Sequence, residues 1–117
     1  MKPVAVILSP EATEVYQKLV VEATTSKRAQ SILKGIKEKT ELIKLNCHYG
    51  DPIAKKLIPK EFLQQYGATN LFRVELPSFW RMLYTLTNDE QEIEIIAFIL
   101  DIGDHKAYDK TMGYRKK

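Results

Sequence analysis

The sequence contains a single cysteine, Cys47, so no disulfide can form within the chain and nothing indicates an oxidising compartment. It also lacks a long apolar run, because the five apolar residues at positions 4–8 end at Ser9 and Pro10. Such a run is too short for the core of a signal peptide and for a membrane span. We therefore expect a cytoplasmic protein that is neither exported nor anchored in a membrane.

Motifs for nucleotide or metal chemistry are missing as well. The chain has no P-loop, no dinucleotide-binding fingerprint and no nucleophile elbow. Cys47, His48 and Asp51 lie close together, but they lack the paired spacing of a structural zinc site. We expect no cofactor and no metal. With 117 residues, the chain is predicted to form a single domain over 1–117, without room for a separate cofactor domain.

The net charge of +3 is unevenly distributed along the chain. Residues 26–60 hold nine basic and three acidic side chains, whereas residues 61–105 hold two basic and eight acidic ones. Residues 106–117 are basic again, with five basic side chains and one acidic one. Basic blocks that meet in the fold would attract a polyanion such as RNA. The alternative is an ordinary solvated helix face, and charge alone favours that alternative.

The first half of the chain is typical of a strand followed by helices. A short run of β-branched and apolar residues indicates a buried strand. Ser9 and Ser26 can each cap a helix, and apolar residues recur at helical spacing after both. These signals predict a strand over 3–8 and helices over 10–24, 27–45 and 60–66.

Beyond Gly67 the period of the apolar residues changes to two, which is typical of strands. The alternation predicts strands over 72–76 and 80–86, a turn at Asn88-Asp89, and a strand over 92–100. Because both faces of that last strand become apolar, we expect it to be central in the sheet. The order is β-α-α-β-β-β. We predict an α+β fold, in which a helical hairpin packs on one face of a small antiparallel sheet, with the first strand alongside.

The register of the hairpin between the strands over 72–76 and 80–86 follows from its apolar pattern. If Leu76 pairs with Trp80 around a three-residue connection, the apolar side chains of both strands share one face. The opposite face is then polar, with Glu75 directly across from Arg81 and Arg73 two residues along. One interpretation is an ordinary cross-strand ion pair, and the other is a functional site.

A second group of polar residues, 104–109, comes directly after the last strand. His105 is the only histidine in the second half of the chain. Histidine can exchange a proton near neutral pH, and a nearby cation can stabilise the charge of a phosphorane-like transition state. The alternative is that His105 and Tyr108 are surface residues without a chemical role.

Three segments carry a resemblance to a known family. They are Leu71–Leu76 (LFRVEL), Phe79–Tyr84 (FWRMLY) and Gly103–Tyr108 (GDHKAY). Together with the order of elements, they resemble the RelE/ParE toxin superfamily over nearly the whole chain. The resemblance implies a RelE-like fold and the toxin component of a type II toxin–antitoxin system. It also implies a metal-independent endoribonuclease, a hydrolase that cleaves mRNA on the ribosome by attack of the ribose 2′-OH on the adjacent phosphate.

The resemblance also assigns roles to individual residues. Arg81 matches the arginine of a Tyr-Arg-x-x-Tyr pattern, with Trp80 in place of the first Tyr, and would stabilise the charged phosphate. Glu75 departs from the pattern, since ribonuclease members often have a basic residue there; it would neutralise Arg81 or act as a base. The implied catalytic residues are Arg81, Arg73, His105, Tyr108 and Glu75. The implied RNA-binding residues are Lys55, Lys56, Lys60, Lys106 and Arg115.

Two further readings within this superfamily stay open. One is a ParE-like toxin that binds DNA gyrase without cutting RNA, and the other is a member whose catalytic face has decayed. In each case the resemblance implies a cognate antitoxin as partner, besides ribosome-bound mRNA for a nuclease. We expect an antitoxin segment to cover the surface around Arg81 and Trp80. Its carboxylates would pair with Lys55, Lys56 or the tail residues Arg115, Lys116 and Lys117.

Overall fold

A computed structural model describes residues 3–88 and 95–113 of the chain. Its strands are β1 (Val4–Leu8), β2 (Asp51–Pro52), β3 (Phe72–Leu76), β4 (Trp80–Asn88) and β5 (Ile95–Gly103). Its α-helices are α1 (Pro10–Glu22), α2 (Lys27–Leu45), α3 (Lys60–Tyr66) and α4 (His105–Met112), and its short 3₁₀ turns are η1 (Lys55–Leu57) and η2 (Pro77–Phe79).

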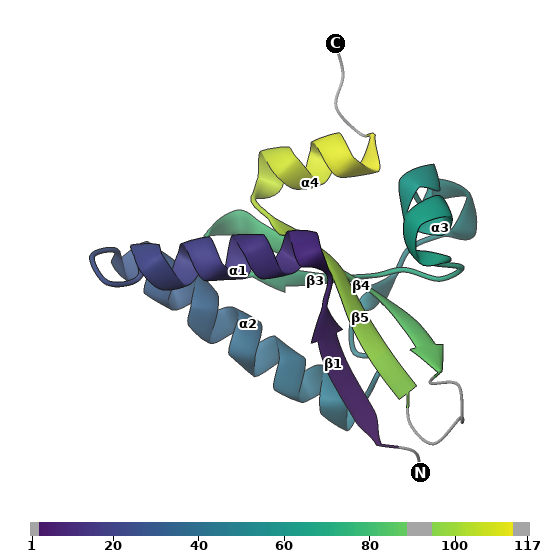
Figure 1. The fold of residues 1–117 in the computed structure, drawn as a ribbon, viewed down its shortest axis with the longest axis horizontal. Helices are drawn as coiled ribbons and strands as arrows, with labels where there is room; N and C mark the ends of the chain where they lie inside the picture. The colour runs from purple at the N-terminus through teal and green to yellow at the C-terminus, as the bar shows by residue number, and fades with distance from the viewer. Residues whose placement is uncertain (1–2, 89–94, 114–117) are drawn as a thin grey trace.

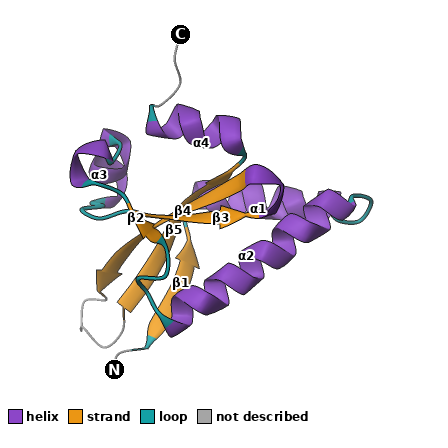
Figure 2. Ribbon diagram, turned by 180° about the vertical axis from the view of Figure 1, so that it is seen from behind, coloured by secondary structure: helices purple, strands orange, loops and turns teal. Residues whose placement is uncertain are grey.

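The strands form one sheet in the order β1-β5-β4-β3-β2. β1 runs parallel to β5, and every other neighbouring pair is antiparallel. The α1/α2 hairpin covers one face of the sheet, whereas α3 and α4 lie on the other (Figures 1 and 2). The predicted α+β fold is confirmed, including the first strand alongside the antiparallel strands and the central place of the last strand.

Local sequence signals determine the helix ends. Ser9 Oγ accepts a hydrogen bond from the Ala12 amide at 3.0 Å, and Ser26 Oγ accepts one from Ala29 at 3.1 Å. These side chains satisfy backbone donors that the first helical turn leaves unpaired. The predicted bounds of α2 and α3 are confirmed, while α1 ends two residues earlier than predicted. None of the helices in the described part of the chain is long and apolar enough to cross a membrane.

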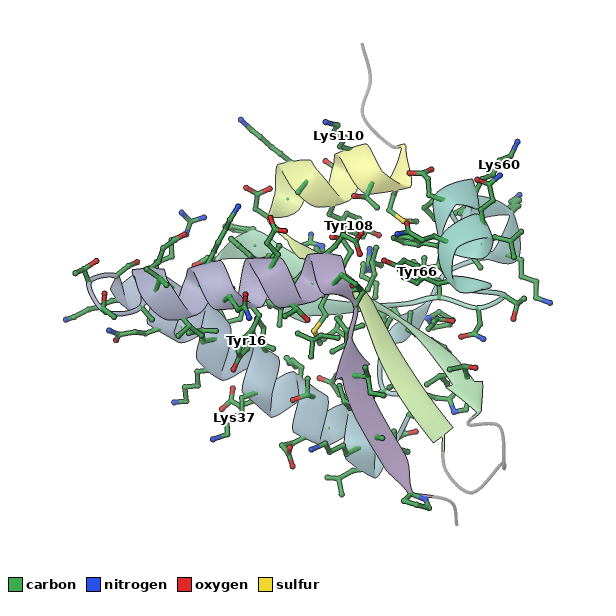
Figure 3. All side chains as sticks on the ribbon, viewed as in Figure 1. Tyr16, Lys37, Lys60, Tyr66, Tyr108 and Lys110 are labelled. Carbon is green, nitrogen blue, oxygen red and sulfur yellow. The ribbon has the colours of Figure 1, made fainter. Side chains whose placement is uncertain are left out.

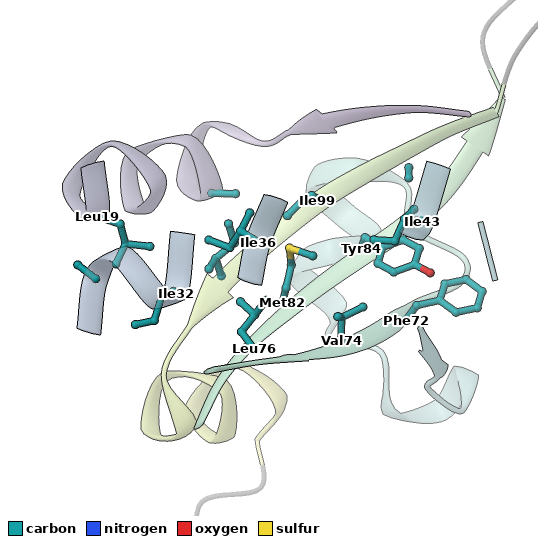
Figure 4. Close-up of a cluster of buried hydrophobic side chains, with 14 residues drawn as sticks. Leu19, Ile32, Ile36, Ile43, Phe72, Val74, Leu76, Met82, Tyr84 and Ile99 are labelled. Atoms are coloured by element: carbon teal, nitrogen blue, oxygen red, sulfur yellow. The ribbon is translucent and has the colours of Figure 1, made fainter. Parts of the chain in front are cut away.

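The main core lies between the α1/α2 hairpin and the sheet. Ile32, Ile36 and Ile43 from α2 pack against the apolar face of β3, β4 and β5 (Figure 4). Because α2 has apolar residues at helical spacing, one stripe of it is buried while its lysines stay near the surface. Burying a side chain of this size stabilises the fold by about 2 kcal/mol.

The predicted hairpin register is confirmed. Leu76 pairs with Trp80, and Glu75 pairs with Arg81, around the three-residue turn η2. That turn places Ser78 and Phe79 in the left-handed region, at φ 61° and 63°. Since non-glycine residues avoid this region, the turn carries local backbone strain.

The opposite face of the sheet is not simply polar, as the alternation had predicted. Leu83 lies on that face and is 1% exposed, because α3 and α4 cover it. It belongs to a second apolar cluster, formed by Phe62, Ala68, Leu71, Leu83, Tyr108 and Met112. We predicted a polar face because the sequence analysis did not include α4, the helix that helps to cover Leu83.

The last strand also differs from its predicted bounds. β5 continues to Gly103, three residues beyond the predicted end at Leu100, and a register shift falls opposite Leu83 and Tyr84 on β4. This irregularity brings Asp101 into the sheet, where sequence propensity disfavours it. The predicted turn residue Asp89 and the predicted strand start at Glu92 lie outside the described residues.

Candidate functional site

The predicted site residues of the hairpin lie on the α3/α4 face of the sheet, in two rows that cross the strands. Glu75 on β3, Arg81 on β4 and Gly103 on β5 form one row. Arg73, Leu83 and Asp101 form the next row. Because side chains alternate along a strand, all of these positions point away from the α1/α2 hairpin.

Arg81 is the second residue of β4 and lies next to the η2 turn. Its Nη1 atom is 4.0 Å from Oε1 of Glu75, and Nη1 also donates to the Phe79 carbonyl at 3.3 Å. Its Cζ atom lies 5.7 Å from the centroid of the Tyr108 ring, which is cation–π distance. The Arg81 side chain is 18% exposed, whereas that of Glu75 is 66% exposed. These contacts hold the guanidinium against the sheet while the carboxylate remains in solvent.

Arg73 reaches the same tyrosine from the neighbouring strand. The Tyr108 hydroxyl lies against the Arg73 guanidinium and raises the pKa of Arg73. Nη2 of Arg73 is also 3.5 Å from Asp51 Oδ2. Among the described residues, the buried Nε atoms of Arg73 and Arg81 have no hydrogen-bond partner. A buried donor without a partner is costly, so these two atoms lower the stability of the fold at this face.

Tyr108 is placed by α4, which the sequence interpretation missed. Asp104 Oδ1 accepts a hydrogen bond from the Ala107 amide at 2.8 Å and so caps the helix. Gly113, at φ 74°, ends it. Tyr108 points from α4 toward the sheet and is 5% exposed, whereas Lys110 points away from the sheet (Figure 3).

His105 takes a different direction from Tyr108. Its side chain is 62% exposed, and its Nε2 atom lies 3.4 Å from Oδ2 of Asp109, one turn further along α4. Within residues 3–88 and 95–113, no hydrogen bond or ion pair joins His105 to Arg73 or Arg81. The structure therefore brings Arg73, Glu75, Arg81 and Tyr108 together but leaves His105 at the edge.

The predicted RNA-binding lysines lie on the turns and helices of the same side. Lys55 and Lys56 belong to η1, Lys60 begins α3, and Lys106 is in the first turn of α4. All four are exposed, and Lys60 points away from α3 into solvent (Figure 3). Among the described residues, no hydrogen bond or ion pair joins these lysines to the face that carries Arg73 and Arg81, here called the arginine face. Arg115, Lys116 and Lys117 lie outside the described residues.

Asp101 is a residue of this face that sequence reasoning missed. Thr111 on α4 donates a hydrogen bond to its carboxylate at 3.2 Å, and burial raises the pKa of Asp101. The charge of Glu11, in the first turn of α1, also raises the pKa of Asp101. The signal was present in the sequence, because Asp101 is the single charged residue within the apolar run of β5 (IIAFILDIG).

In the described part of the chain, no three side chains of His, Cys, Asp or Glu lie close enough together to hold a metal ion. Cys47 Sγ lies 3.5 Å from His48 Nδ1, but no carboxylate completes that pair. The chemistry available at the candidate site is therefore that of arginine, tyrosine and carboxylate side chains, with histidine at the rim.

Comparison with known proteins adds no assignment to this geometry: no protein-family model matches the chain, and no curated protein matches it at a significant level.

Proposed function

We propose that this protein is a toxin of the RelE/ParE type and acts as a metal-independent endoribonuclease that cleaves mRNA on the ribosome. The observation that carries the proposal is that Arg73 and Arg81, on neighbouring strands, both contact the buried Tyr108. Two guanidinium groups held on one face provide the charge and the fixed donors that a phosphate requires. The small α+β fold with its helical hairpin is consistent with the resemblance in sequence.

The proposed reaction needs charge stabilisation and proton transfer. The ribose 2′-oxygen loses its proton and bonds to the adjacent phosphorus, while the bond from phosphorus to the 5′-oxygen breaks. The products are a 2′,3′-cyclic phosphate and a 5′-hydroxyl group, which gains a proton. Arg81 is assigned to the charge that develops on the phosphate oxygens, because its contact with Glu75 is long and solvent-exposed.

His105 is assigned to proton transfer at the rim of the face. Its exposure leaves it free to approach a bound RNA, and catalytic contacts often tighten once the substrate is bound. Glu75 is the nearest carboxylate to Arg81 and is the alternative base. The lysines of η1, α3 and α4 are assigned to the RNA backbone.

The decisive experiment compares three proteins on translating ribosomes programmed with a defined mRNA: wild type, Arg81→Ala and the control Arg28→Ala. Arg28 is an exposed arginine in the first turn of α2 and is absent from the Arg73/Arg81 face. We expect wild type and Arg28→Ala to cut the mRNA, leaving cyclic phosphate ends. Arg81→Ala should lose about 100- to 1,000-fold in rate, as expected when an electrostatic donor is removed. An uncut mRNA with wild-type protein refutes the proposal.

One observation favours a second candidate function, a ParE-like toxin that binds DNA gyrase. Glu75 stands opposite Arg81 and offsets its charge, and in the described part of the chain His105 shares no hydrogen bond or ion pair with the arginines. Such a face also suits the binding of a protein partner. A supercoiling assay separates the two functions: inhibition of gyrase, together with intact mRNA on translating ribosomes, assigns the chain to this class.

The proposed partner is an antitoxin whose segment covers Arg81 and Trp80. Phe79, the last residue of the η2 turn, is 79% exposed at the end of the hairpin. Trp80 packs on the α1/α2 side of the sheet, opposite to Arg81, and its buried Nε1 atom has no hydrogen-bond partner among the described residues. An apolar segment with carboxylates that crosses the end of the hairpin at Phe79 would cover both sides. Its affinity should fall with added salt, and it should protect the β3–β4 hairpin from hydrogen exchange. A salt-independent affinity contradicts this interface.

A further inference from the structure

The outer edge of β1 is unpaired within the described part of the chain, because β5 is its only strand neighbour there. The strand has the sequence VAVIL, without a charged residue or a proline. Edge strands usually carry a charge, a proline or a bulge that prevents pairing with another chain. β1 has none of these protections, and its Ile7 side chain is 45% exposed.

A groove follows this edge on the α1/α2 face of the sheet. It encloses about 560 Å³ where the two helices diverge above β1. Figure 3 shows Tyr16 extending from α1 toward α2, with Lys37 on the α2 side of the same region. The groove is lined by Val6 and Leu8 from β1, Thr13 and Tyr16 from α1, and Ile36, Lys37, Thr40 and Lys44 from α2.

The charged side chains that line the groove are all positive. Its apolar residues come from the strand and the inner side of the helices, and its charged residues are Lys37 and Lys44. Lys44 contacts Glu41 at 3.2 Å on the exposed side of α2. Among the described residues, no carboxylate lies within ion-pair distance of Lys37. A ligand for this groove therefore needs apolar side chains and carboxylates.

We propose that β1 and this groove bind an extended acidic segment of a partner protein, which adds to the sheet as a sixth strand. Its backbone pairs with the free edge of β1, and every second side chain faces the groove. Of these groove-facing side chains, the central ones are apolar, and carboxylates at the outer positions pair with Lys37 and Lys44. Backbone hydrogen bonds between the segment and β1 supply affinity. The lysines and the apolar groove supply selectivity for a segment that contains both acidic and apolar residues.

A second copy of this chain does not fit the groove as well. Symmetric pairing of two β1 edges would bring the lysines of both α2 helices toward each other, and β1 has no carboxylate to offset them. The charges therefore favour an acidic partner over self-association.

This inference goes beyond the proposed function and does not depend on it. The groove lies on the α1/α2 face, whereas Arg73 and Arg81 lie on the α3/α4 face. A segment bound at β1 leaves the arginine face open. Loss of RNA cleavage in Arg81→Ala therefore has no bearing on the binding at β1.

The test uses a synthetic peptide probe, acetyl-Glu-Thr-Val-Thr-Ile-Thr-Val-Thr-Glu-amide, whose odd-numbered residues share one face and so present apolar side chains and carboxylates together. A matched peptide has lysine in place of each acidic residue. Binding to the full chain is followed by fluorescence anisotropy, and hydrogen exchange identifies the protected amides. We expect the acidic peptide to bind and to protect β1, and the lysine peptide not to bind. Absence of binding up to about 1 mM acidic peptide overturns the proposal.

Charge-reversal variants of the protein locate the contacts. The double variant Lys37→Glu/Lys44→Glu should weaken binding of the acidic peptide about tenfold or more, since attraction becomes repulsion. Arg28→Glu is the control, because nine residues separate it from Lys37 and place it on the opposite side of α2. Equal weakening by the control would overturn the charge assignment.

Peptides N-methylated along one edge or the other test the strand pairing. One of the two should lose binding at least about tenfold, because methylation removes the amide donors that face β1. Equal binding of both methylated peptides, or protection confined to β3 or α4, overturns the assignment to β1. A dimer that forms without peptide and protects the β1 amides from exchange would make a second copy the occupant instead.

Discussion

The hydroxyl group of Thr111 donates a hydrogen bond to the carboxylate of Asp101 at 3.2 Å, which ties α4 to β5 beside Leu83. α4 also carries Tyr108, the residue that both arginines contact. The position of the helix therefore decides the geometry of the arginine face. Asp101 and Thr111 hold that helix in place from its C-terminal end.

Asp101→Asn is expected to stabilise the protein at neutral pH. Burial raises the pKa of Asp101 above its ordinary value of 3.8, so the folded state binds this proton more tightly than the unfolded state. The stability from this group is complete below the ordinary pKa and is lost as the pH rises through the raised pKa. Asparagine stays neutral and still accepts from Thr111. Urea unfolding at several pH values should show an advantage for the variant at neutral pH that shrinks toward acid.

Thr111→Val provides the control for this prediction. It removes the donor but keeps the size of the side chain, so it should destabilise wild type and should not reproduce the pH dependence of Asp101→Asn. A variant Asp101→Asn that is less stable than wild type at neutral pH would show that the charged carboxylate stabilises α4.

Tyr84→Phe is expected to destabilise the fold by about 2 kcal/mol. The Tyr84 hydroxyl is buried, donates to the Cys47 carbonyl at 2.8 Å and accepts from the Gly50 amide at 2.9 Å. Phenylalanine keeps the ring against Phe72 but leaves both backbone groups unpaired. Tyr16→Phe, at an exposed tyrosine, is the control and should change the free energy of unfolding by less than about 0.5 kcal/mol. Equal effects of the two substitutions would contradict the role of the buried hydroxyl.

Gly35→Ala is expected to destabilise the fold by about 1–3 kcal/mol, although alanine favours an isolated helix. A Cβ atom at Gly35 would lie 2.4 Å from Cδ of Pro77 in the η2 turn. Thermal unfolding of Gly35→Ala, Pro77→Ala and the double variant measures the coupling. The double variant should recover part of the loss, and strictly additive effects would show that the clash is relieved elsewhere.

His105→Ala is expected to slow RNA cleavage about 100-fold or more, because the proposed function assigns a proton transfer to this side chain. Its melting temperature should stay close to that of wild type, since the side chain is 62% exposed. Asp109→Asn removes the neighbouring carboxylate and keeps the histidine, so it should cost much less activity. Full activity in His105→Ala would assign the proton transfer to Glu75 instead.

The hairpin could be predicted from sequence because its two apolar patterns fit one register only. A two-residue loop would have placed Arg81 opposite Val74, whereas the observed pairing places it opposite Glu75. The bounds of α2 were predictable for a similar reason, since Ser26 begins a long and regular apolar stripe. Local patterns of this kind contain enough information to specify strand register and helix length.

The cover over the arginine face was not predictable in the same way. α4 has only eight residues, and its stripe of Tyr108 and Met112 is too short for a periodic signal. Asp104 and Gly113 are its end signals, but both are also common in loops. The contacts of Tyr108 and Asp101 with other elements depend on how α4 packs on the sheet. The sequence of α4 alone does not determine that packing.

The parallel pairing of β1 with β5 has a consequence for synthesis of the chain. Val4 pairs with Ile95, so the first strand of the fold cannot join the sheet until the last strand has left the ribosome. Until then, the α1/α2 hairpin has only β3 and β4 to pack against, and the part of its apolar surface that covers β1 and β5 stays exposed. Completion of β5 is therefore the event that converts the nascent chain into a folded protein, and that step joins the α1/α2 hairpin, β1 and β5 together.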